Sequence, residues 1–582
     1  MDRTSWIGVT VCAILFAAWM WYTSTVYPKR PLPTPLSTNS ATNSSTTSQD
    51  PGTVHSMTPG VTSNLKAISP LAPEQTVTLQ NDFVKITFTS NGGGVKQVEL
   101  LKHLGKTKSE NLILHEHSLL PFLARQGWTE GSEVYALERQ GEQIIAKALL
   151  PNGLSIVRLY TLKNQYQIEL QETFRNPSAQ PIVLPNFILS IGSGEPVHTH
   201  DQPTYLKSGW IAKESDSYKS HALAEMSGGF FSQAKSQIVQ PTPNLNWAAT
   251  SNQFFGSIIK IPSEFKSLEL ICHPLPLPKT DEKSIAASGI YSTVSFQGLT
   301  IPAQSETKGT YEIYTGPKEY AILKNLSDFQ DHIMDFSIWG WVIKPLLWIM
   351  HHIHRPLTYF GNPLVLNYGW VIVLLTILLK LIFWPLQSTA NKSMKKMQAL
   401  APKMEELKKK HEKNPQKMNE EIMKLYRDYG VNPVGGCLPM LVQFPIFLGL
   451  YTLLQSAVEV RNESFFWIKD LAQPDTIYTI TNLGMGLHID VNPLPLIMTA
   501  TSVLLMKMTP QTTDNPQMKM LQWMPVLFLY MLYNFAAALS LYWTVNNLLS
   551  MFQTYQNLKT PPPKLQRVKK KLPFGFGNLP AS

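Results

Sequence analysis

Two different hydrophobic patterns divide the chain. Between residues 71 and 316, apolar and polar positions alternate, as Tyr166, Ile168 and Leu170 do with the glutamines and glutamate around them. Segments rich in turn-forming residues, such as SNGGG, RNPSAQP and IGSGEP, separate these runs. Period-two alternation between turns is typical of half-buried strands in an antiparallel β-sandwich. We therefore expect a β-sandwich domain over residues 71–330.

Beyond residue 366 the pattern changes to long apolar runs. They predict a core of five membrane spans within 367–556, at 368–386, 434–458, 493–508, 521–535 and 537–555. The last two runs are so close that they require a tight helical hairpin around residues 534–540. A sixth run, 6–26, is 21 uncharged residues, about 31 Å of helix and enough to cross a bilayer. Its Trp19, Trp21 and Tyr22 favour an uncleaved anchor (1–27) over a signal peptide, which ends in small residues.

Three segments connect these parts. Residues 28–70 are rich in Pro, Ser, Thr and Asn and predict a flexible tether. In 331–366, the apolar run 336–350 is short and is broken by Lys344 and Pro345, which favours an amphipathic helix at the membrane surface.

The third connecting segment, 387–430, predicts a helical hairpin that turns at Asn414 and Pro415. Residues at three-four spacing, most of them apolar, mark one face of each arm: Leu400, Met404, Leu407 and His411, then Met418, Ile422, Leu425 and Tyr429. This stripe is interpreted as the seam of the hairpin, and docking of targeting factors on its methionines is the alternative.

Charge orients the spans. The chain carries a formal net charge of +10, and residues 387–432 hold 11 Lys or Arg against 6 Asp or Glu. The tail 557–582 holds 6 basic residues and no acidic one, whereas 459–492 holds only Arg461 and Lys469 as basic residues. The positive-inside rule puts the hairpin and both termini in the cytoplasm, and the β-domain outside. The basic RVKKK patch of the tail either serves topology alone or binds ribosomal RNA or anionic lipid.

Motifs of known enzyme classes are absent from the sequence. There is no Walker loop, GxSxG, HExxH or dinucleotide fingerprint, so we expect neither an enzyme nor a cofactor. Cys12, Cys272 and Cys437 are far apart and predict no disulfide framework or zinc site. The sequence VHTHD, with His198, His200 and Asp201, imitates a metal site. No other segment of the sequence is identified that supplies a further ligand, so we expect no metal there.

Lys380 is the one charged residue in the span 368–386. A charge at that depth costs at least about 2.5–3.5 kcal/mol unless it faces water or a partner. The alternative is that the side chain snorkels to the inner surface, about 9 Å along the helix. Thr376 lies one turn earlier on the same face, and Gln443 lies mid-span between Pro439 and Pro445. Together they predict a water-filled groove within the bilayer.

Three segments carry a resemblance to a known family. LYRDYGVNPVGGCLPMLVQFPIF (425–447), KMTPQTT (507–513) and the run 522–553 are similar to the YidC/Oxa/Alb family of membrane protein insertases, in its Gram-negative form with a large periplasmic domain. The resemblance implies a bacterial inner-membrane insertase with a hydrophilic groove open to cytoplasm and lipid. It implies these groove residues: Lys380, where the family carries an arginine, Thr376, Gln443, Tyr542 and Trp543. Ala536-Ala537-Ala538 departs from the common Pro-Ser-Gly and puts the geometry of that turn in doubt.

The mechanism expected from these residues needs no nucleotide. Lys380 attracts a polar or acidic segment into the groove, and the apolar segment leaves along a hydrophobic slide driven by partitioning into lipid. The residues expected to form the slide are Met440, Phe444, Phe447, Phe528 and Leu532. Expected partners are nascent membrane proteins, membrane lipids and the Sec translocon, with the ribosome and the signal recognition particle receptor at the hairpin and tail. The competing classes are a small-solute transporter and a membrane-anchored glycan enzyme that uses the sandwich.

Overall fold

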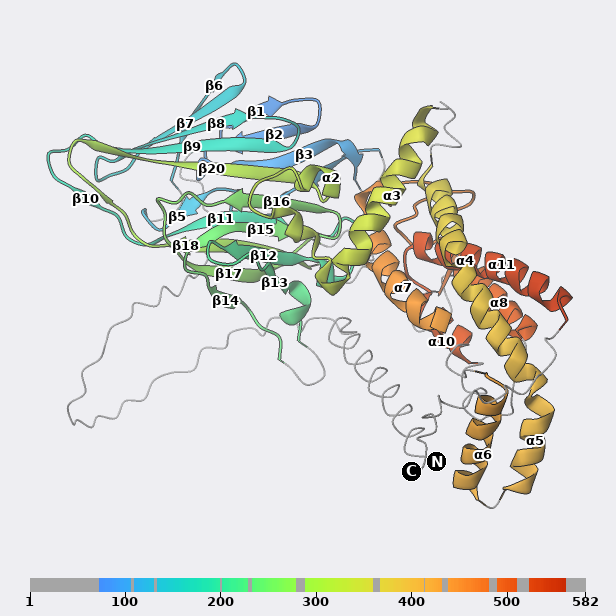
Figure 1. Ribbon diagram of the computed structural model, residues 1–582. Helices are drawn as coiled ribbons and strands as arrows, with labels where there is room; N and C mark the ends of the chain where they lie inside the picture. The colour runs from blue at the N-terminus through green and yellow to red at the C-terminus, as the bar shows by residue number, and fades with distance from the viewer. Residues whose placement is uncertain are drawn as a thin grey trace, which may run out of the picture. The chain divides into compact units, whose positions relative to one another are not determined.

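The structure is a computed structural model that describes residues 73–105, 109–129, 133–198, 201–228, 233–278, 288–359, 367–412, 414–431, 438–480, 489–509 and 523–561. The predicted anchor 1–27, the tether 28–70 and most of the tail 557–582 lie outside the described residues. The chain divides into two compact units, one β-rich unit that ends at Ile333 and one helical unit that begins at Met334. Each is described by itself (Figure 1).

The larger sheet of the β-rich unit has nine strands in the order β13-β12-β15-β16-β20-β9-β8-β7-β6. Their bounds are β6 Ala136–Gln140, β7 Gln143–Leu149, β8 Ser155–Leu162, β9 Gln167–Asn176, β12 Lys207–Ala212, β13 Lys219–Ala222, β15 Leu245–Ser251, β16 Phe255–Lys260 and β20 Ser305–Pro317. Every neighbouring pair is antiparallel.

Two smaller sheets and one two-stranded ladder complete this unit. The sheet β14-β17-β18-β11-β5 lies against the nine-stranded sheet, because β11 and β18 contact β12, β15 and β16. The sheet β1-β2-β3-β4 lies beside β6 and β7. Their bounds are β1 Thr76–Gln80, β2 Val84–Thr89, β3 Val95–Leu104, β4 Asn111–Leu114, β5 Arg125–Gln126, β11 Phe187–Gly194, β14 Ile238–Pro241, β17 Ser267–Pro276 and β18 Ser288–Phe296; β10 (Ile182–Val183) pairs with β19 (Thr300–Ile301), and α2 is Tyr320–Leu323. The predicted antiparallel β-sandwich is confirmed.

The alternation seen in the sequence decides which side chains form the core of the sandwich. Tyr166, Ile168 and Leu170 are buried, with polar neighbours between them that are not fully buried. The core also encloses a charged cluster that the pattern did not reveal. Arg125, Arg158 and Glu172 are all fully buried, and the carboxylate accepts from Arg158 Nε at 2.7 Å and also pairs with Arg125. Buried charges are stable only when paired in this way.

In the helical unit, α11 (Ala537–Lys559) contacts α4 (Tyr368–Ala399), α7 (Leu438–Ser456) and α8 (Pro493–Met508). Alongside them are α3 (Gly340–Tyr359), which contacts α4 and α7, and α10 (Met524–Leu532), which contacts α8. A small ladder of β21 (Tyr478–Ile480) and β22 (Ile489–Val491) lies in the segment between α7 and α8. Figure 1 shows this bundle in yellow to red.

The helices differ in length from the predicted spans. Helix α8 coincides with 493–508, but α4 continues thirteen residues past the predicted end at 386 because no strong helix breaker follows Pro385 before Leu400. Helix α7 ends at Ser456 and α10 at Leu532, two and three residues before the predicted ends at 458 and 535. Within the described residues, only Tyr368–Ala399 is long and apolar enough to cross a membrane by those two criteria; Pro493–Met508 is a shorter apolar helix.

The turn between α10 and α11 covers residues 533–536 rather than 534–540. Helix α11 begins at Ala537, where the predicted span 537–555 also begins, and loop carbonyls receive its first amides: Ala537 N–H donates to Gln473 O and Ala538 N–H to Leu471 O, both at 2.9 Å. These two amides would otherwise lack partners at a helix N-terminus. The alanines at 536–538 therefore make a tight turn without Pro-Ser-Gly.

Helix α3 (Gly340–Tyr359) contains most of the apolar run 336–350 and continues beyond its end. It passes through Lys344 and Pro345 without a break, so these residues interrupt the apolar run but not the helix. Its apolar side chains at 342, 343, 346, 347 and 350 are buried, while Trp341 and Trp348 are more than 60% exposed. This one-sided burial is the amphipathic pattern that the sequence predicted.

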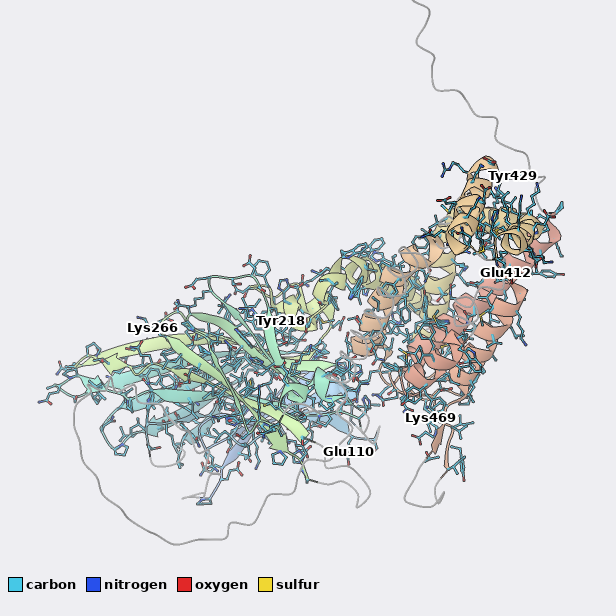
Figure 2. All side chains as sticks on the ribbon, turned by 90° about the horizontal axis from the view of Figure 1, so that it is seen from below. Glu110, Tyr218, Lys266, Glu412, Tyr429 and Lys469 are labelled. Atoms are coloured by element: carbon cyan, nitrogen blue, oxygen red, sulfur yellow. The ribbon has the colours of Figure 1, made fainter. Side chains whose placement is uncertain are left out.

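The segment 387–430 forms the end of α4 and a hairpin of α5 (Ala401–Lys410) and α6 (Pro415–Asp428). Asn414 caps α6 by accepting from Lys417 N–H at 3.2 Å, with Pro415 at the first helical position. Leu400 and Met404 are buried, and Tyr426 OH donates to Met404 Sδ at 3.0 Å. Figure 2 labels Tyr429 at the end of α6, where Lys403 lies over its ring. These contacts favour the seam interpretation of the stripe.

Candidate functional site

Helices α4 and α11 contact each other and carry polar residues into the same space. On α4 these are Lys380, Gln387, Asn391 and Lys395, and on α11 they are Asn546, Ser550, Gln553, Thr554 and Asn557. Residues spaced by three, four or seven positions lie on one face of a helix. Each helix therefore presents a polar stripe along one face, and the two stripes enclose a groove.

Lys380 lies at the head of this groove and lines both of its cavities. Its Nζ donates to Ser550 Oγ at 2.7 Å, and Ser550 Oγ in turn donates to the carbonyl of Asn546 at 2.7 Å. None of the ion pairs found among the described residues includes Lys380. The ammonium is thus held by neutral oxygen and is available to an anionic group.

The smaller of the two cavities, called the upper cavity, is lined by Gln443 and Tyr542 together with Lys380. Gln443 Nε2 donates to Tyr542 OH at 2.6 Å, and both side chains line the same cavity as Thr376 and Lys380. Thr376 is buried and donates its hydroxyl to Ile372 O at 2.7 Å in its own helix, so it adds little hydrogen-bonding capacity to the cavity. The structure therefore brings together four of the five residues predicted for the groove.

The lower cavity, of about 390 Å³, continues from Lys380 towards the C-terminal end of α11. Lys395 lies at this end and donates to the carbonyls of Asn557 and Thr560 and to the Thr560 hydroxyl. A lysine at the last carbonyls of a helix also complements the helix dipole. No Asp or Glu lines either cavity, so the groove carries two positive charges and no negative one.

Trp543 does not line the groove. Its ring packs against Phe447 at 4.9 Å and Phe528 at 5.1 Å between ring centroids. Adjacent helical residues point about 100° apart, so Tyr542 faces the groove while Trp543 faces α7 and α10. The assignment of Trp543 to the groove needs correction.

The predicted hydrophobic slide is exposed only in part. Phe444 is 56% exposed, whereas Leu532 is 4% exposed and packs with Met498 and Leu539. Phe447 and Phe528 lie on the edge of that cluster. Leu532 is therefore a core residue rather than a contact surface, and the side chain of Met440 lies outside the described residues.

Sequence reasoning missed most of the α11 side of the groove. Asn546, Ser550, Gln553 and Asn557 recur every three or four residues in an apolar span, and that periodicity was the available signal. It also missed Asn547, which is buried and donates to Thr501 Oγ1 at 3.1 Å and Ser502 Oγ at 2.8 Å on α8.

Two residues of the VHTHD motif, His198 and Asp201, contact each other within the described part of the chain. Asp201 accepts from the backbone amides of Val197 at 2.6 Å and His198 at 2.9 Å, and lies 3.2 Å from His198 Nδ1. His200 lies outside the described residues. Within the described part of the chain, no three His, Cys, Asp or Glu side chains gather as metal ligands.

A lysine-bearing polar groove among apolar helices, joined in one chain to a large antiparallel β-domain, defines a helical membrane protein with an extramembrane domain. Two family models match it: "60Kd inner membrane protein" over residues 360–562 and "YidC periplasmic domain" over 76–349. A membrane protein insertase YidC of Pelobacter propionicus is 32% identical over 507 residues, covering 83% of this chain and 86% of the relative. One of Herminiimonas arsenicoxydans is 28% identical, covering 86% and 85%. The chain belongs to the YidC family of inner-membrane insertases.

The solved structures similar to this chain include an active YidC insertase crystal structure with its first transmembrane domain resolved. It is 17% identical and covers 84% of this chain and 95% of its own, with a TM-score of 0.33. Family membership rests on the sequence comparisons.

Proposed function

We propose that this chain inserts integral membrane proteins into the bacterial inner membrane and helps them to fold, alone or with the Sec translocon. The groove between α4 and α11 receives the client segment that must cross. The observation that carries this proposal is the Lys380 ammonium, held by Ser550 in a polar cavity that no acidic side chain lines. The names of the relatives, membrane protein insertases, support the same role.

Electrostatics gives Lys380 a role at the start of insertion. At an effective dielectric constant of about 20, two opposite unit charges 4 Å apart attract by about 4 kcal/mol. An acidic residue in the client's translocated segment gains part of this attraction on entering the groove. That gain offsets part of the cost of removing polar groups from water, which rises to several kcal/mol per unpaired group in hydrocarbon. Lysine supplies this attraction without the bidentate geometry of arginine.

The client's apolar segment then moves into lipid because apolar surface is more stable there than in water. Exposed side chains on two helices support an exit path: Phe444 on α7, and Val526 and Tyr530 on α10. Phe447 and Phe528 form the base of this path. No nucleotide is needed, because partitioning supplies the free energy.

The charge pattern supports the topology proposed for the whole chain. Six spans place both termini, the hairpin and the lower end of the groove in the cytoplasm, with the β-rich domain in the periplasm. In this arrangement the hairpin and basic tail meet the ribosome or the signal recognition particle receptor.

Reconstitution tests the proposal directly. Purified chain in liposomes, without Sec components or ATP, receives a small single-span client with an acidic outer tail. Protection of the tail from added protease measures insertion. We expect protection above that of empty liposomes, and a loss of about tenfold with Lys380→Ala, which corresponds to about 1.4 kcal/mol of lost attraction.

Two controls sharpen this experiment. Lys380→Arg keeps the charge and should retain most of the activity. Lys507→Ala removes a lysine at the end of α8 that does not line either cavity, and should leave insertion unchanged. If Lys380→Ala and Lys507→Ala behave alike, Lys380 has no electrostatic role in the groove.

A further inference from the structure

Carboxamides dominate the lower cavity of the groove. Six of them line it: Gln387, Asn391, Gln443, Asn546, Gln553 and Asn557. A carboxamide combines one hydrogen-bond acceptor with a donor, which is the same combination that a peptide group offers. Such a lining suits a ligand that both donates and accepts hydrogen bonds along its length.

Gln553 is the most informative of the six. Its residue is 2% exposed, and neither its Nε2 nor its Oε1 has a hydrogen-bond partner among the described residues. The Nδ2 of Asn557, one turn further along α11, also lacks a partner there. A buried amide with both functions unpaired destabilises a fold by about the desolvation cost of those groups. A binding partner that supplies one donor and one acceptor removes this cost.

We propose that this carboxamide lining binds the peptide backbone of the client's translocated segment, with Gln553 pairing reciprocally with the N–H and the C=O of one residue in an extended chain. This inference rests on the proposed insertase function and identifies what the lower groove recognises. A backbone is common to every sequence, so the site holds uncharged segments as well as acidic ones. Lys380 adds attraction for acidic residues above it.

The chemistry favours a backbone over an anionic headgroup. A phosphate or carboxylate only accepts hydrogen bonds, so it leaves the Oε1 of Gln553 without a donor. A peptide chain supplies both a donor and an acceptor to that amide. From Asn546 to Asn557 the α11 stripe extends about 16 Å, which corresponds to about five residues of extended chain.

The test uses a chemically synthesised single-span client with an uncharged, glycine-rich outer tail and a nitrobenzoxadiazole label at its tip. A second client carries sarcosine in place of each glycine, so that its tail keeps the carbonyls but loses the amide N–H groups. The intact chain is reconstituted in liposomes, and protection of the label from dithionite measures translocation of the tail.

We expect Gln553→Leu to lower the initial rate for the glycine tail about 25-fold, the factor that two net hydrogen bonds of about 1 kcal/mol each provide. The same variant should lower the rate for the slower sarcosine tail only about fivefold, because that tail keeps the carbonyl that accepts from Gln553 Nε2 but has no N–H to donate. Equal losses for both tails would show a packing role, and no loss for the glycine tail would show that Gln553 does not meet the client. Either result overturns the proposal.

Two further measurements separate this proposal from its alternatives. Gln556→Leu changes an exposed glutamine on the same helix that does not line the cavity, and should have no effect. Gln553→Leu should keep or raise the thermal unfolding temperature, because it removes unpaired buried polar atoms; a structural role predicts a lower temperature. Failure of the wild type to insert the acidic client above empty liposomes would instead count against the insertase function itself.

Discussion

At the scale of single residues, the sequence pattern identified which side chains of the strands are buried. It did not identify which side chains of a membrane helix face the groove. Ile168 and Leu170 are buried as their alternation predicted, because a strand has only two faces. A span of apolar residues has no such limit. Tyr542 and Trp543 are both large aromatic residues, and only packing against α4, α7 and α10 decides that Tyr542 faces the groove.

His115 shows a second residue-scale effect that composition could not reveal. Its Nδ1 accepts from the Ser193 backbone amide at 3.0 Å, which requires that Nε2 carries the proton donated to Ser257 Oγ at 2.9 Å. Burial lowers the pKa of His115 to about 4, although the nearby Glu195 acts in the opposite direction. The folded β-rich domain therefore holds this histidine neutral.

The free energy of unfolding of this domain should consequently depend on pH. Between about pH 6.5 and pH 4 the unfolded chain binds a proton at residue 115 that the folded chain does not, so stability falls as pH falls through this window. The loss attributable to His115 amounts to about 3 kcal/mol at the lower end. Hydrogen exchange of β11 amides in the intact chain, corrected for intrinsic rates at each pH, measures it. His115→Gln should reduce the slope, and equal slopes in the two proteins would contradict this assignment.

At the scale of elements, the sequence located the helices better than it located their ends. Helix α4 runs through Pro385 and beyond the predicted membrane boundary, since proline removes one hydrogen bond without ending a helix that neighbours support. Helix α11 begins at the predicted residue 537 but ends at Lys559 rather than 555, and carbonyls more than sixty residues earlier in the chain accept from its first amides. Both outcomes depend on tertiary contacts, which a local pattern does not contain.

Asn547 should stabilise the contact between α11 and α8. Its Nδ2 donates to Met498 O, Thr501 Oγ1 and Ser502 Oγ, and such interhelical bonds contribute about 0.5–1.5 kcal/mol in membrane proteins. We expect Asn547→Ala to lower the thermal unfolding temperature in detergent. Asn546→Ala is the matched control, because Asn546 is the adjacent residue on the same helix and its side chain lines the cavity instead. It should reduce insertion while leaving the unfolding temperature unchanged, and the reverse pattern would exchange the two roles.

At the scale of the whole molecule, composition along the chain predicted the division into a β-rich and a helical part, because strands and apolar helices have different periods. The number of spans depends on residues 6–26, which lie outside the described residues, and on whether α7, α8, α10 and α11 cross the membrane as well as α4. The orientation depends on charge rather than on geometry. The number and orientation of the membrane spans therefore require an independent measurement.

Three positions test the proposed topology. Lys147 lies on β7 of the β-rich domain, Lys469 lies in the loop between α7 and α8, and Glu412 lies at the turn of the hairpin; Figure 2 labels the last two on the helical unit. Each is replaced by cysteine, one at a time, in a chain whose native Cys12, Cys272 and Cys437 are serine. A membrane-impermeant maleimide is then added to spheroplasts or to inverted vesicles.

The positive-inside rule makes a specific prediction for these variants, because the hairpin is rich in lysine and the α7–α8 loop is not. Lys147→Cys and Lys469→Cys should react in spheroplasts, and Glu412→Cys only in inverted vesicles. Labelling of Lys469→Cys and Glu412→Cys from the same side would mean that α7 does not cross the membrane. Labelling of Lys147→Cys from the same side as Glu412→Cys would place the β-rich domain on the side of the hairpin. The predicted span 368–386, which lies between them, would then not cross the membrane. Only the expected pattern puts the Lys380 groove between a cytoplasmic entrance and a periplasmic end, which an insertase of this design requires.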